Sequence, residues 1–246
     1  MEIILAAYQE AILMGFANGP LAPGRYALPQ SSLRLFASEV MPHFRKDSTP
    51  MSHLIVGIGG TTRAGSSSEL AVHTALAAAE RRGARTVRFG GDFLAALPHY
   101  APESAERTDQ QRQLVEAVRQ ADGLVIGSPG YHGGVSGLVK NALDLLEDLR
   151  EDERVYFDGR AVGLVVTAAG WQACGTTLAA LRSTVHAMRG WPTPLGVTLN
   201  SGQGPLFMPD GTCADPTTAA QLDLLARQVQ EFAQRFAAPT GAVRVA

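Results

Sequence analysis

The sequence predicts a doubly wound α/β domain, in which a parallel sheet carries helices on both of its faces. Short apolar runs closed by glycine alternate along the chain with longer segments of helical periodicity, as in successive βαβ units. A chain of 246 residues, 46% of them hydrophobic, is also large enough to bury one core without disulfides or metals. We therefore expect five strands and five helices that cross back over the sheet.

The expected strands are short and apolar. Residues 54–58 form an uninterrupted apolar run that ends in glycines, which is typical of a parallel strand covered on both faces. Four further strands are expected at residues 86–89, 123–127, 163–168 and about 195–199.

The expected helices repeat their apolar residues at helical spacing. In the first, at 66–82, Leu70, Thr74 and Ala78 share one stripe, and Gly83 ends the helix. The other helices are expected at residues 109–120, 136–149, about 175–189 and about 216–237. Residues 90–108, with two prolines, are expected to form a long loop. Five strands and five helices fit the flavodoxin-like strand order 2-1-3-4-5.

Composition and charge exclude several classes of partner. With 21 basic and 23 acidic residues the net charge is −2, so we expect neither nucleic acid nor an anionic membrane as partner. The two cysteines lack metal-ligand spacing, which favours reduced thiols in a cytoplasmic protein and predicts no metal site. No apolar run reaches about 20 residues, the length that a membrane helix needs. The N-terminus also lacks the basic cluster of a signal peptide.

The first 50 residues differ from the rest of the chain. Helical patterns at about 2–17 and 31–44 flank a stretch rich in turn residues, and residues 47–50 look like a linker. We expect two parts, an N-terminal helical extension at 1–50 and the α/β domain at 51–246.

The loop after the first strand has the composition of an anion site. Ligands of open α/β sheets bind beyond the carboxyl ends of the strands, near the point where the strand order reverses. Residues 59–68 (GGTTRAGSSS) bring glycines, hydroxyls and Arg63 to the N-terminus of a helix, whose free amides and dipole favour a phosphate. The loop is neither a P-loop nor a G-x-G-x-x-G turn. The alternative is an ordinary helix cap with a polar loop.

The loop after the third strand, residues 127–137 (GSPGYHGGVSG), offers a flat aromatic surface. Tyr131 can lie against a planar ring, and Gly133 and Gly134 let backbone amides approach the edge of that ring. The alternative is an ordinary loop tyrosine beside a surface imidazole, His132.

Both loops resemble one family. Residues 128–147 (SPGYHGGVSGLVKNALDLLE) are similar to the S-P-x-Y-x-G-x-x-x-G-x-x-K-N-A-[LI]-D segment of the NADPH-dependent FMN reductases, and the first loop is similar to that family's G-S-x-R-x-G-S-x-[NS] phosphate loop. The resemblance covers about 54–236. One departure is Gly130, where many members carry Glu, so a role for that side chain in subunit contacts is not carried over.

The resemblance implies which residues bind FMN. Those implied to hold its phosphate are Thr61, Arg63, Ser66 and Ser68. Those implied to line the isoalloxazine ring are Pro129, Tyr131, His132 and Gly133. In that family the residues matching Lys140, Asn141 and Asp144 are structural or lie at a subunit contact.

The loop after the fourth strand is expected to cover the other side of the cofactor, through Gly170 and Trp171. Trp171 is expected either to stack on flavin or nicotinamide or to pack within the loop. Cys174 lies nearby, but no base that would make it a nucleophile is identifiable.

The resemblance implies an NAD(P)H-dependent FMN reductase that passes hydride from NADPH or NADH to FMN, without a catalytic side chain. The flavin carries the chemistry, and the protein supplies position and charge. The family is usually dimeric or tetrameric. Two alternatives are an FMN-containing quinone or azo reductase and a non-enzymatic flavodoxin-type FMN-binding protein. The near-neutral charge weighs against an electron carrier.

A second, shorter resemblance lies in the N-terminal part. Residues 28–45 (LPQSSLRLFASEVMPHFR) resemble the C-terminal end of luciferase-like flavin monooxygenases, although 50 residues cannot form the barrel of such an enzyme. The segment is either read-through from an adjoining gene, with Met51 as the natural start, or the remnant of a fusion. The alternative is a native extension that covers a dimer surface. A flavin-dependent monooxygenase is accordingly expected as the partner that receives reduced FMN.

Overall fold

The computed structural model of this protein describes residues 52–236, and the structural statements below refer to that part of the chain. The helical patterns expected at about 2–17 and 31–44 lie outside the described residues.

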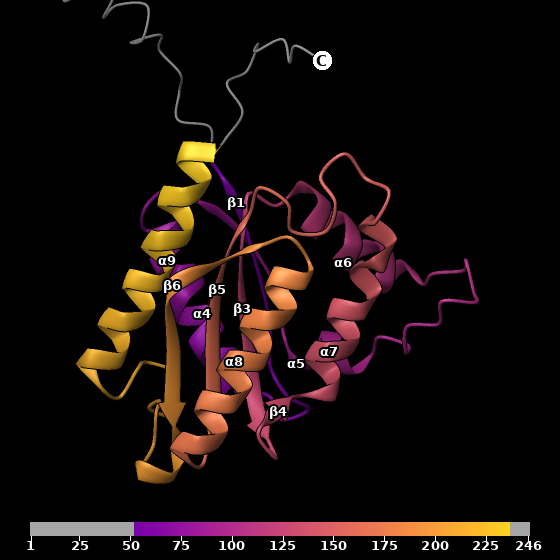
Figure 1. The fold of residues 1–246 in the computed structure, drawn as a ribbon. Helices are drawn as coiled ribbons and strands as arrows, with labels where there is room; N and C mark the ends of the chain where they lie inside the picture. The colour runs from indigo at the N-terminus through magenta and orange to yellow at the C-terminus, as the bar shows by residue number, and fades with distance from the viewer. Residues whose placement is uncertain (1–51, 237–246) are drawn as a thin grey trace, which may run out of the picture. The chain divides into compact units, whose positions relative to one another are not determined.

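A parallel sheet forms the centre of the described part (Figure 1). Its parallel strands are β1 (Leu54–Gly59), β2 (Arg85–Phe89), β3 (Gly123–Tyr131), β5 (Ala161–Ala168) and β6 (Trp191–Asn200). They lie in the order β2-β1-β3-β5-β6, and the short strand β4 (Gly134–Val135) pairs antiparallel with the end of β3. The parallel order is the one expected from the sequence. The sheet has six strands rather than five because β3 continues into a hairpin.

Helices cover both faces of the sheet, which confirms the doubly wound α/β class (Figure 1). On one face lie α4 (Ser67–Glu80) and α9 (Pro216–Phe236). On the other lie α5 (Gly91–Ala95), α6 (Asp109–Gln120), α7 (Gly137–Asp144), the 3-10 turn η2 (Leu145–Leu149) and α8 (Trp171–Ala187). Alternate strand residues serve the two faces. In β3, Leu124 and Ile126 join the core under α6–α8, whereas Val125 joins the core under α4 and α9.

Glycines in the strands allow α4 and α9 to lie close to the sheet. A Cβ atom on Gly57 would lie 2.8 Å from a methyl of Val72, and one on Gly127 would lie 3.0 Å from the carbonyl oxygen of Ser68. In β5, a Cβ on Gly163 would lie 2.9 Å from Cγ of Leu225. The first turn of α4 therefore rests directly on the carboxyl end of β3, which is where the sequence predicts a ligand.

Three expected boundaries were wrong. Residues 90–108 are not a continuous loop, because α5 begins directly after β2 at Gly91. The helix expected at 136–149 is α-helical only to Asp144 and tightens into η2. The helix expected from about 175 already begins at Trp171.

Strand β6 begins at Trp191, four residues earlier than its expected start at about 195 (195 − 191), although Pro192 and Pro194 lie within it. Proline removes a backbone donor and is tolerated in a strand mainly at the edge of a sheet. Among the described strands, β6 is an edge strand, since it pairs only with β5. Across residues 52–236, no helix combines the length and the apolar character needed to cross a membrane.

Replacing Gly163 with Ala is expected to destabilise the fold by about 1–3 kcal/mol, the usual cost of overpacking a core. The added methyl group meets Leu225 and Val229 of α9. Gly175→Ala is the matched control, because its Cβ meets nothing within 4 Å and alanine favours a helix. Urea unfolding of both variants measures the difference. Equal stability of Gly163→Ala and the wild type would contradict the close packing.

Candidate functional site

A pocket of about 350 Å³ lies at the carboxyl ends of β1 and β3, the switch point of the sheet. Its walls come from the loop after β1, the end of α5 with the segment that follows it, the end of β3 and the first part of α7. The residues that line it are Gly60, Thr61, Thr62, Ala95, Leu97, His99, Pro129, Tyr131, Ser136, Gly137, Leu138 and Asn141. Of the ten residues expected to bind the cofactor, the structure places Thr61, Pro129 and Tyr131 in this lining.

Ser66 and Ser68 lie at the N-terminus of α4. Both residues are buried, and their hydroxyl oxygens are 3.5 Å apart. Ser66 is the N-cap residue, but its side chain makes no capping hydrogen bond to the helix. The first backbone N–H groups of a helix have no partner within it, so here they remain available to an anion, which the helix dipole also favours.

Thr61 and Arg63 shape the loop that leads to this helix. The Thr61 hydroxyl accepts a hydrogen bond of 3.1 Å from the backbone N–H of Arg63, which makes a tight turn. Arg63 itself is exposed, so its guanidinium can reach a phosphate without first losing an ionic partner within the core.

A carboxylate in the first turn of α4 is balanced by a cation. Glu69 accepts a hydrogen bond of 3.0 Å from Nη1 of Arg88 in β2. Without this pair, Glu69 would repel a phosphate at the helix start. The ion pair also ties α4 to the edge strand β2.

The loop after β3 is a hairpin whose tip is His132-Gly133. Both residues have positive φ, 53° and 77°, as a two-residue type I′ turn requires. The Ser128 hydroxyl closes the base of the hairpin by accepting a hydrogen bond of 3.0 Å from the N–H of Ser136. Tyr131 projects from this rigid hairpin with 59% of its surface exposed, so its ring is free to lie against a ligand.

The departure at Gly130 has a steric reason. A Cβ atom there would lie 2.9 Å from the Thr177 hydroxyl and 3.1 Å from the carbonyl oxygen of Ala173, both in α8. A glutamate at this position would push the hairpin away from α8. The glycine therefore sets how closely the hairpin and α8 approach each other.

Sequence reasoning missed the wall formed by the segment after α5. Leu97 and His99 of this segment line the pocket, and Asn141 of α7 holds it in place. The Asn141 side chain accepts from the N–H of Tyr100 at 2.8 Å and donates to the carbonyl of Pro98 at 3.1 Å. The expected strand order could have revealed this wall, because the parallel strands β1 and β2 are neighbours and the segments that follow them leave the sheet at the same edge.

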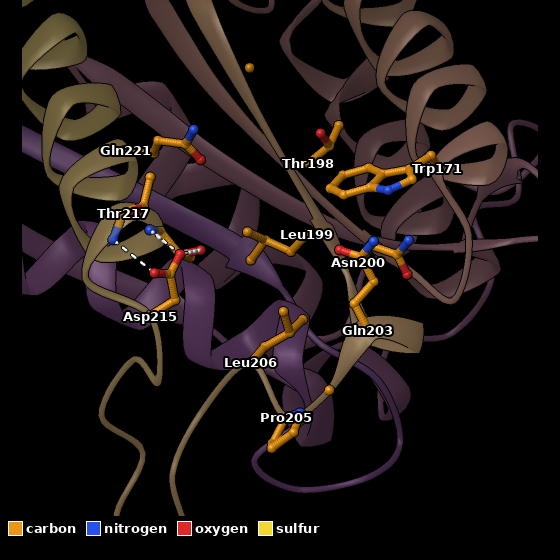
Figure 2. Close-up of a pocket in the computed structure, with 13 residues that line it drawn as sticks. Trp171, Thr198, Leu199, Asn200, Gln203, Pro205, Leu206, Asp215, Thr217 and Gln221 are labelled. Carbon is orange, nitrogen blue, oxygen red and sulfur yellow. Dashed lines mark hydrogen bonds between the residues drawn. The ribbon is translucent and has the colours of Figure 1, made fainter.

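The loop after β5 is shorter than expected, because α8 begins at Trp171. Gly170 is the N-cap of α8, and Trp171 is its first residue, with 55% of its surface exposed. Trp171 lines a second pocket, of about 420 Å³, formed with β6 and the start of α9 (Figure 2). It is not among the residues that line the first pocket.

Cys174 is buried beneath this helix start. Its thiol donates to the carbonyl of Leu199 at 3.5 Å, and burial raises the pKa of the thiol. A protonated, enclosed thiol is a poor nucleophile. Among the residues that the structure describes, no three His, Cys, Asp or Glu side chains are grouped so that they could hold a metal ion.

This arrangement defines a class of protein. The start of α4, with its uncapped N–H groups, and the pocket lined by Tyr131, Pro129 and Leu97 both lie at the switch point of a doubly wound sheet. A helix start that favours an anion, next to an apolar pocket, is the arrangement that suits a nucleotide.

Comparison with known proteins identifies the family. Residues 54–204 match the NADPH-dependent FMN reductase family, and the chain belongs to that family. Over 93 residues the chain is 34% identical to the FMN-dependent NADPH-azoreductase of Staphylococcus aureus, a match that covers 38% of this chain and 46% of that protein. The chain thus spans about half the length of the curated relatives it matches.

Solved structures share the fold. The flavoenzyme NAD(P)H:(acceptor) oxidoreductase FerB from Paracoccus denitrificans has a TM-score of 0.60 at 18% identity, over 74% of this chain and 98% of that chain. The NADH:FMN oxidoreductase EmoB has a TM-score of 0.54 at 20% identity, over 74% and 89% of the two chains. Identities this low support the fold alone.

The residues present fit the FMN that the family implies. The start of α4, with two buried hydroxyls and amides not capped by Ser66, suits the dianionic phosphate. The aromatic and apolar wall at Tyr131, Pro129 and Leu97 suits the ring. The individual roles of the ten expected residues stay predictions.

Replacing Arg63 with Ala is expected to weaken FMN binding by about 1.5–3 kcal/mol, the usual contribution of a charged hydrogen bond. Arg85→Ala is the matched control. It removes the same charge from an exposed residue at the amino end of β2, away from the pocket. Titration of the apoprotein with FMN, followed by flavin fluorescence, gives both dissociation constants. An unchanged constant for Arg63→Ala would refute its phosphate role.

Proposed function

We propose that this protein is an NAD(P)H-dependent FMN reductase. The observation that carries the proposal is the phosphate cradle at the start of α4 beside a slot for a planar ring, in a chain of the FMN reductase family. Bound FMN supplies the redox chemistry, because it accepts a hydride from a nicotinamide and passes electrons to an acceptor.

The chain itself contributes position and polarity. Ser66, Ser68 and the amides of α4 hold the phosphate, and this fixes one end of the flavin. The hairpin tip at His132-Gly133 lies at the carboxyl end of β3, and the N–H of Gly133 donates to the carbonyl of Gly130 at 3.4 Å. A backbone N–H near this tip that is not used within the hairpin would favour negative charge on a reduced ring. The ring of Tyr131 is exposed, so the nicotinamide can stack beside it. No side-chain acid or base is required for these roles.

A second candidate is an FMN-containing quinone or azo reductase. This candidate is favoured by the similarity to an FMN-dependent NADPH-azoreductase, which is 34% identical over 93 residues. The two candidates differ in the fate of FMN, which is a released substrate in the first and a resident cofactor in the second. A third candidate, an electron-carrying flavodoxin-type protein, is disfavoured by the net charge of −2.

An assay of NADPH and NADH oxidation by the pure protein separates these candidates. The assay is run with and without free FMN, and with quinone and azo acceptors. Activity that rises steeply with added FMN supports the reductase. Activity that needs only bound FMN and prefers a quinone or azo dye supports the second candidate. A protein that binds FMN but oxidises neither nucleotide would sink both enzymatic proposals.

The proposal extends to the surroundings of the enzyme. We propose a homodimer or homotetramer in the cytoplasm, supported by an exposed Trp191 beside the ring pair Phe232–Phe236 and by the free thiols of Cys174 and Cys213. A flavin-dependent monooxygenase is the proposed recipient of reduced FMN, on the resemblance of residues 28–45 to the end of such enzymes.

Residues 1–50 are proposed to lie outside the flavin domain. A chain that starts at Met51 is therefore expected to keep its melting temperature and its affinity for FMN. Thermal unfolding, FMN titration and light scattering of the short and full chains test this together. A large loss of stability, or dissociation to monomers in the short chain alone, would mean that the segment is a native structural extension.

A further inference from the structure

The second pocket lies beyond the FMN site, between the first turns of α8 and α9 (Figure 2). The buried side chain of Leu199 in β6 forms its floor. Trp171 stands on one side, and Gln221 and Thr217 of α9 stand on the other, as the close-up shows. At about 420 Å³ the pocket is large enough for a bicyclic ring.

The charge of this pocket disfavours an anionic ligand. Within the described part of the chain, Asp215 is the only charged residue that lines it. Its carboxylate caps α9, accepting from the N–H groups of Thr217 at 3.1 Å and Thr218 at 2.9 Å. The cap uses the helix start that would otherwise attract an anion, and among residues 52–236 no Lys or Arg lines the pocket. A neutral group is therefore the suitable occupant.

The remaining side chains suit a flat ring with polar edges. The indole of Trp171 is 55% exposed and can stack on such a ring. Asn200, Gln203 and Gln221 supply amides, and the Asn200 oxygen already accepts from the N–H of Gly202 at 2.9 Å. An amide side chain offers a donor and an acceptor together, which matches the adjacent donor and acceptor on an adenine edge.

We propose that this pocket binds the adenine ring of the nicotinamide dinucleotide. The identity of the dinucleotide rests on the proposed function, whereas the preference for adenine rests on the pocket alone. The pocket adjoins the end of β6, two strands from β3, and strand spacing puts these ends about 10 Å apart. An extended dinucleotide whose nicotinamide lies at Tyr131 spans this separation. In this arrangement Trp171 contacts the adenine end of the dinucleotide.

The first test measures binding without flavin or catalysis. The chain has two tryptophans, so in a Trp191→Phe background the fluorescence of the protein reports Trp171. Adenosine is expected to quench it saturably, and Gln221→Ala in that background is expected to weaken the affinity about tenfold, the effect of losing a bidentate amide contact. Gln120→Ala, an exposed glutamine of α6 on another surface, is the matched control and should keep the affinity.

The results of this titration decide between ligands. Saturable quenching by adenosine but not by cytidine supports the proposal. No saturable quenching by adenosine overturns it, as does equal binding of both nucleosides. Quenching by a neutral quinone such as menadione, without any by adenosine, also overturns it and assigns the pocket to an acceptor ring.

The second test uses the enzyme loaded with FMN. Reduced nicotinamide mononucleotide carries the nicotinamide but lacks adenosine. Gln221→Ala is expected to lower the preference for NADPH over this truncated donor, measured as the ratio of kcat/KM values, by about tenfold. An unchanged ratio overturns the proposal. A wild-type protein that oxidises neither donor refutes the proposed function instead, while the adenosine titration still reports on the pocket.

Discussion

The close contact between α4 and the strands β1 and β3 is the constraint on which the site depends. Glycine at positions 57 and 127 lets Val72 and the first turn of α4 rest on the strand backbones. The N–H groups of that turn consequently lie at the switch point of the sheet, beside the slot formed by Tyr131 and Pro129. A larger residue in either strand would lift the helix and move its first turn away from the pocket at Tyr131 and Pro129.

The sequence predicted the elements whose signals are local. Helix α6 has the predicted bounds because Thr108 and Gln111 form a capping box at its start, in which the Thr108 hydroxyl accepts at 3.2 Å and the Gln111 amide oxygen at 2.8 Å. The strand order also followed from the alternation of apolar runs and helices. In the site, the positions of Thr61, Pro129 and Tyr131 in the pocket lining were predictable because each lies at or just beyond the carboxyl end of a buried strand.

What was missed depends on contacts between distant residues. The pocket wall at Leu97 and His99 is held by Asn141, about forty positions later in the chain, and no local pattern reveals that pairing. Arg160 is a second example. It is fully buried and donates to the carbonyls of Arg119, Ala121 and Tyr156, while burial lowers its pKa to about 10. By composition alone, an arginine at that position reads as a surface residue.

The two prolines of β6 have a consequence for assembly. Pro192 and Pro194 have no N–H, so the first part of this outer strand cannot complete a hydrogen-bonded ladder with another chain. At the opposite border of the sheet, β2 carries the exposed Arg85, whose charge discourages the pairing of a foreign strand. Within residues 52–236, both borders therefore disfavour growth of the sheet from one molecule into the next, the step by which fibrils elongate.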